Sequence, residues 1–86
     1  MISGKTSTGF EFVIDEEKLN DMRFVDVLAE TSENVLAFPK VIAMLLGAEQ
    51  KAKLYEHLEE DGRVPIESVQ AAVAEIMEAS AKTKNS

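Results

Sequence analysis

The chain has 86 residues and no cysteine, and its 16 acidic side chains outnumber nine basic ones to give a formal net charge of −7. This length fits one small domain with a modest core, which excludes a deep, multi-layered active site. The absence of cysteine excludes disulfides and thiolate chemistry, and the acidity disfavours direct contact with nucleic acid.

The N-terminal segment alternates apolar and polar residues. Phe10, Phe12 and Ile14 recur with period two, which is typical of a half-buried β-strand. The turn sequence TSTG precedes this strand, so residues 2–5 are predicted to form the returning partner of a hairpin. A two-stranded hairpin is marginal by itself, and its apolar face is therefore expected to pack on helices.

Four helices are predicted after the hairpin, because the apolar spacing changes to a period of 3.6 residues. The first is expected after Asp15, with its amphipathic pattern from Leu19 to about Thr31. The others are expected at about residues 39–47, 48–60 and from 65 onward. Asp15 is a candidate N-cap, Pro39 and Pro65 suit the first position of a helix, and Gly47 is expected to end one.

These elements predict an α+β, mostly helical fold in which an N-terminal β-hairpin packs on about four helices. Residues 1–80 are expected to form a single small globular domain, and the polar residues 81–86 a flexible tail. The predicted core draws on the strand and on every helix: Phe12, Phe24, Leu28, Ile42, Leu45, Leu54, Leu58, Val73 and Ile76.

The stretch LEEDGRVPIESV, residues 58–69, has some features of a calcium-binding loop. With Gly62 at the sixth position of an EF-hand loop, the first and twelfth positions would be His57 and Ser68, which are the wrong ligands. We therefore predict no metal site here. The expected role is a turn, in which Gly62 caps one helix and Pro65 opens the next.

No catalytic or cofactor-binding residues are predicted. His57 is the only histidine, and the sequence places no nucleophile and orienting group beside it, so a surface position is expected. The segment GKTSTG lacks the spacing of a phosphate-binding loop. No serine lies in the Asp-Ser-Leu setting of an acyl-carrier protein. The longest apolar-rich stretch, residues 35–48, contains Pro39 and Lys40 and is too short to span a bilayer.

The segment before Pro39 is the candidate partner-binding site. Val35, Leu36 and Phe38 gather apolar side chains ahead of a helix start, where a small core has limited room. Phe38 suits either a hydrophobic staple that fixes the helix entry or an exposed anchor for a partner. Exposed apolar residues of this kind are suited to gripping a partner helix.

Three stretches together resemble the small tail assembly chaperones of siphophages and related prophages of Gram-positive bacteria. They are KTSTGFEFVIDEEKLNDMRFVDVLAE, LAFPKVIAMLLGAEQKAKLYEHL and EEDGRVPIESVQAAVAEIM, which cover about residues 5–78. Within them, the TGFEF entry strand, the PK…LLG helix and the DGRVP turn follow one another in the order found in that family. These motifs are structural rather than catalytic.

The resemblance implies a non-enzymatic assembly factor in the cytoplasm of the bacterial host. Such chaperones bind and solubilise the tape measure protein, are displaced as the tail tube protein polymerises, and are generally absent from the mature virion. Self-association is compatible with this role. The alternative is a small acidic prophage regulatory protein that binds a host or phage DNA-binding protein, which the charge favours equally.

Overall fold

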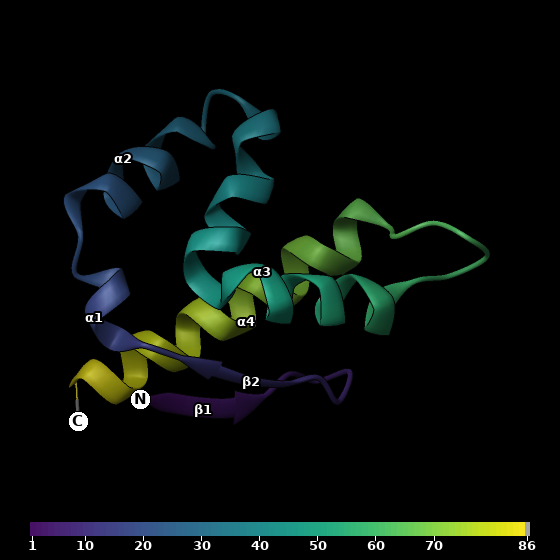
Figure 1. The fold of residues 1–86 in the computed structure, drawn as a ribbon, viewed down its shortest axis with the longest axis horizontal. Helices are drawn as coiled ribbons and strands as arrows, with labels where there is room; N and C mark the ends of the chain where they lie inside the picture. Colours follow the sequence, from purple (N-terminus) through teal and green to yellow (C-terminus); the bar gives the residue numbers. More distant parts are fainter. Residues whose placement is uncertain (86) are drawn as a thin grey trace.

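An antiparallel hairpin opens the chain in the computed structural model, which describes the backbone of residues 1–85 and the side chains of residues 1–80. Strand β1 (Ile2–Lys5) pairs with β2 (Glu11–Ile14), with Ile2 opposite Ile14. The hairpin lies along helix α4 (Figure 1). The predicted hairpin and the α+β, mostly helical fold class are confirmed.

The buried face of the hairpin depends on a close contact between Gly4 and Phe12. These residues are directly opposite in the ladder, and a Cβ atom at Gly4 would lie 2.8 Å from Cζ of Phe12. A side chain at position 4 would therefore collide with the ring. The absence of one lets the tip of the Phe12 ring approach Gly4 while Phe12 is buried in the core.

The one helix predicted between Asp15 and about Thr31 is two helices, which are separated at Asn20 and Asp21. Helix α1 (Glu16–Leu19) is capped by Asp15, whose Oδ1 accepts from the N–H of Glu17 at 3.0 Å. Helix α2 (Met22–Glu30) is capped in the same way by Asp21, at 2.9 Å from the N–H of Arg23. The second aspartate starts a new helix although the apolar spacing continues through the break.

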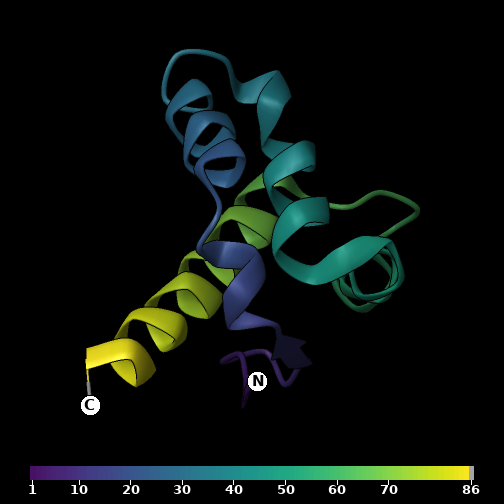
Figure 2. The ribbon, with the colours of Figure 1, turned by 60° about the vertical axis from the view of Figure 1, so that its left-hand side comes forward.

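The second and third predicted helices are two arms of one bent helix. After a short 3₁₀ turn, η1 (Val35–Ala37), helix α3 runs over Phe38–Leu58. Gly47 interrupts it with φ 83° and ψ 159°, a conformation that only glycine adopts readily. The chain changes direction sharply there (Figures 1 and 2), so the predicted break at Gly47 is correct.

Helix α3 ends at Leu58 and is followed by a tight two-residue turn. Glu60 and Arg63 exchange two backbone hydrogen bonds of 2.7 and 3.1 Å, and the residues between them, Asp61 and Gly62, both have positive φ. Positive φ at both positions is the mark of a type I′ turn, for which Asp-Gly is a preferred pair. Gly62 is therefore a turn residue and not the helix cap that the sequence predicted.

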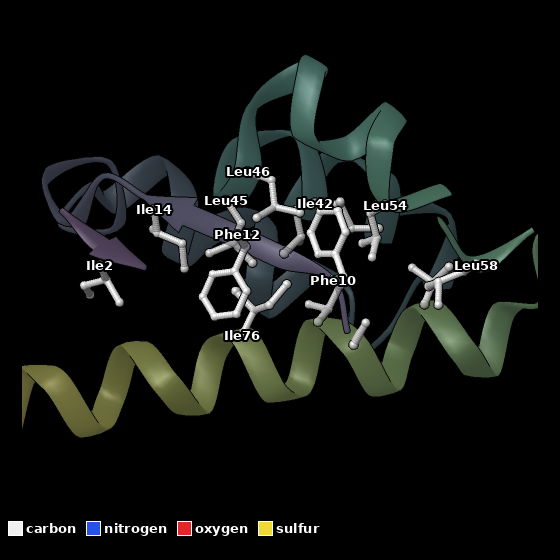
Figure 3. Packing of buried hydrophobic residues seen from close by; sticks show 14 of the residues in the cluster. Ile2, Phe10, Phe12, Ile14, Ile42, Leu45, Leu46, Leu54, Leu58 and Ile76 are labelled. Carbon is white, nitrogen blue, oxygen red and sulfur yellow. The ribbon is translucent and has the colours of Figure 1, made fainter. Parts of the chain in front are cut away.

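Helix α4 (Ile66–Asn85) follows Pro65 directly and runs below the hairpin and α3 in the view of Figure 3. Its backbone remains helical into the segment predicted as a polar tail. The side chains of residues 81–86 lie outside the described residues, so the flexibility of that segment stays a prediction. None of the helices in the described part of the chain is long and apolar enough to cross a membrane.

The core lies where the hairpin, both arms of α3 and α4 meet (Figure 3). Eight of the nine predicted core residues are buried, and Leu28 is only half-buried at the edge of the cluster. The side chains with almost no exposed surface come from the hairpin, α3 and α4. They are Ile14, Val41, Ile42, Leu45, Leu54 and Ile76.

We predict that Leu45→Ala lowers the free energy of unfolding by about 2–5 kcal/mol, because it removes a fully buried side chain and leaves a cavity. Leu45 is 2% exposed, whereas Met22, the matched control, is 68% exposed. Met22→Ala is expected to change stability by less than about 0.5 kcal/mol. Urea denaturation measures both. A loss of under about 1 kcal/mol for Leu45→Ala would contradict the central position of this residue.

Candidate functional site: an apolar groove

An apolar groove of about 300 Å³ lies where η1, the two arms of α3 and the start of α4 meet. Every side chain that lines it is aliphatic or aromatic. The lining residues are Val35, Leu36, Phe38, Pro39, Tyr55, Val64, Ile66 and Val69. A hollow of this composition is suited to apolar side chains of a partner, and its volume is at the low end of ligand pockets, which span about 300–1,000 Å³.

The groove is bordered by large aliphatic side chains that remain in solvent. Leu36 is 83% exposed, Ile66 65% and Val35 58%. Phe38 is half-buried, with one side packed against the core and the other lining the groove. The structure thus brings the three predicted partner-binding residues, Val35, Leu36 and Phe38, to one surface. Their binding to a partner stays a prediction.

The geometry of η1 explains why Val35 and Leu36 point outward. Asn34 caps the turn by accepting from the N–H of Leu36 at 3.1 Å. A 3₁₀ helix has about three residues per turn, so consecutive side chains point in directions about 120° apart. Ala37 takes the inward position and is buried. The other two side chains must then face away from the core.

The bend at Gly47 brings the two ends of α3 to the same groove. Phe38 lies at the start of the first arm and Tyr55 near the end of the second, and both line the groove. In a straight helix these residues would be separated by about 25 Å, at 1.5 Å per residue. The site therefore exists only because the helix folds back at this glycine.

Tyr55 is the only tyrosine of the chain, which contains no tryptophan. Partial burial raises the pKa of the Tyr55 hydroxyl above its usual value of 10. The ammonium group of Lys51 lies 5.7 Å from the ring centroid, within the range of a cation–π contact. Tyr55 is therefore both a wall of the groove and a spectroscopic reporter of it.

Sequence reasoning missed Val64 and Ile66 as groove residues. Ile66 is three residues before Val69 on α4, and this helical spacing predicts the same inward face for both side chains. Val69 is buried, but Ile66 extends past the end of the core and stays exposed. The helical spacing places Ile66 on the same face of α4 as Val69. Only the tertiary structure shows that no described residue covers Ile66.

His57 contacts the hairpin turn. Its ring is exposed, and Nε2 lies 3.1 Å from the carbonyl oxygen of Thr8, which only accepts, so Nε2–H is the donor. The ring also lies 5.7 Å from that of Phe10. These contacts hold the hairpin turn against α3. Within the described residues, no group of three or more histidine, aspartate or glutamate side chains is arranged to hold a metal ion.

Comparisons of this chain with protein-family models, curated proteins and solved structures give no match. The family resemblance therefore rests on the sequence motifs alone.

We predict that Gly47→Ala destabilises the fold by about 1–3 kcal/mol, because alanine is strained at φ 83° and ψ 159°. A Cβ atom there would meet no other atom within 4 Å, so the penalty comes from the backbone and not from a collision. Relief of the strain straightens α3 and moves Tyr55 away from Phe38, which changes the fluorescence of Tyr55.

Ala52→Gly is the matched control for Gly47→Ala, since it weakens an exposed helical position by about 0.5–1 kcal/mol without affecting the bend. It should leave the Tyr55 spectrum unchanged. An unaltered stability and spectrum in Gly47→Ala would show that the bend does not depend on glycine.

The raised pKa of Tyr55 gives stability a defined dependence on pH in the alkaline range. The folded protein retains the phenolic proton at pH values where the unfolded chain has lost it. The contribution of Tyr55 is thus fully present below about pH 10 and is lost as pH rises through the higher folded pKa. Tyrosinate absorbance during an alkaline titration should show a midpoint above that of the urea-unfolded chain, and Tyr55→Phe should abolish the signal. Equal midpoints would contradict the burial of the hydroxyl.

Proposed function

We propose that this protein is a non-enzymatic tail assembly chaperone that uses the apolar groove to bind amphipathic helical segments of a tape measure protein and keep that protein soluble. The observation that carries the proposal is the exposure of Val35, Leu36 and Ile66 around a groove lined by aliphatic and aromatic side chains. The motif resemblance supplies the identity of the partner. The proposed place of action is the cytoplasm of the bacterial host.

The form of the groove favours a helix as its occupant. An amphipathic helix presents apolar side chains at i, i+3, i+4 and i+7, and these insert into a hydrophobic groove. Full burial of one large aliphatic side chain contributes about 1.5–3 kcal/mol, so the three exposed side chains supply a favourable but limited driving force. The formal charge of −7 keeps the protein and any coated partner in solution.

The displacement of the chaperone by the tail tube protein belongs to the same proposal. A contact based on a few apolar side chains releases readily when a competing surface covers the same partner helix. The chaperone would then leave the growing tail and be absent from the mature virion. This step is supported by the family resemblance and by the small size of the groove.

The charge of the chain supports a second candidate, an acidic regulator that binds a DNA-binding protein. Salt separates the two candidates. An apolar contact survives moderate salt, whereas a contact between an acidic surface and a basic partner weakens steeply as the charges are screened.

Co-expression with a tape measure protein of a siphophage tests the chaperone function. We expect a soluble complex that co-purifies at both low and moderate salt. Leu36→Asp should abolish the complex, because it places a charge on the most exposed apolar residue of the groove. Met22→Asp is the matched control, since Met22 is also apolar and exposed but lies on α2 outside the groove lining.

Three outcomes decide between the candidates. An insoluble tape measure protein and no complex at any salt would refute the chaperone function. A complex that survives Leu36→Asp would leave the function standing and exclude the groove as its surface. A complex that forms at low salt only, and that also forms with a DNA-binding protein, would favour the regulator.

A further inference from the structure

The side-chain amide of Gln50 occupies the free edge of β2. Its Oε1 accepts from the N–H of Val13 at 2.8 Å, and its Nε2 donates to the carbonyl of the same residue at 2.7 Å. Nε2 also donates to the carbonyl of Leu46 at 2.8 Å, within its own helix. At Val13, Gln50 therefore makes the same pair of hydrogen bonds that a residue of a neighbouring strand would make.

The direction of the backbone groups follows from the hairpin register. Thr6 donates its N–H to the carbonyl of Phe10 at 2.9 Å, so Phe10 and Phe12 direct their backbone groups toward β1. Bonded and non-bonded pairs alternate along an antiparallel ladder, and so Glu11 and Val13 direct theirs away from β1. The outer edge of β2 thus presents two N–H and two C=O groups, and Gln50 binds those of Val13.

A trough of about 710 Å³ lies next to this edge. It is lined by residues of both strands, including Lys5 and Val13, and by Glu49, Gln50 and Lys53 of the second arm of α3. Val13 is 48% exposed, so the edge also carries an accessible β-branched side chain. Edges with these features pair readily with other chains unless a specific feature blocks them.

We propose that Gln50 is an edge cap that prevents β2 from pairing with β2 of a second copy of this chain. An antiparallel pairing centred on Phe12 would join Glu11 of each copy to Val13 of the other, with four backbone hydrogen bonds and no like charges directly opposite. Each of these two residue pairs contains one Val13. A cap on Val13 in both copies therefore blocks the entire pairing.

Amide hydrogen exchange in Gln50→Ala, measured by NMR over a concentration series, tests the cap. At low concentration the Val13 amide should exchange about tenfold faster than in the unmodified protein, since it has lost its acceptor. As concentration rises, the amides of Glu11 and Val13 should become protected together, and light scattering should detect a dimer. The matched control is Glu49→Ala, which removes the adjacent exposed side chain and its 3.6 Å ion pair with Lys53; it should remain a monomer with slow exchange at Val13.

Gln50→Met keeps the length of the side chain and the helix propensity but removes both hydrogen-bonding groups, and it provides the same test if Gln50→Ala does not fold. Unchanged exchange at Val13 would overturn the cap. Faster exchange with no dimer at millimolar concentration would overturn the proposed pairing. A dimer in which the amides of Glu11 and Val13 still exchange fast uses another surface, and this result too would overturn it.

Discussion

The backbone conformation of Gly47 is the constraint on which the rest of the structure depends. A straight helix of the 21 residues in α3 would be about 31 Å long, while the molecule measures 37 × 28 × 19 Å. One end of such a helix would leave the core. The bend allows Ile42 on the first arm and Leu54 on the second to be completely buried in the same cluster. The bend also creates the groove, because it brings Phe38 on the first arm and Tyr55 on the second arm to the same hollow.

Local signals in the sequence were sufficient for most of the fold. The period-two alternation identified the hairpin, Asp15 was recognised as a cap, and Gly47 was recognised as a break. The break before α2 could not be predicted from periodicity, because Leu19 and Met22 keep a helical spacing across it. Only the capping residue Asp21 indicates that a new helix begins. The sequence predicts a helix cap at Gly62, whereas the pair Asp61-Gly62 forms a type I′ turn, for which Asp-Gly is a strong hairpin signal.

The groove could be predicted only in part, because it is built from segments that are distant in sequence. Val35, Leu36 and Phe38 stood out as a local excess of apolar residues. Ile66 joins them from about thirty residues later, and it does so through a helix bend and a turn whose geometry no local pattern specifies. Exposure is a tertiary property. The same helical spacing that buries Val69 leaves Ile66 in solvent.

An open apolar groove and an open sheet edge would both favour self-association, yet the chain treats them differently. The edge of β2 is closed by two hydrogen bonds between Gln50 and Val13, whereas the groove remains uncovered by any described residue. Under the proposed function this difference is required, because the groove must stay available to a partner. Its small apolar area makes one contact weak, since association costs offset several kcal/mol of hydrophobic gain. Stable coating of a long rod would then depend on many copies binding along it, and the weakness of each contact would let the copies be removed one at a time.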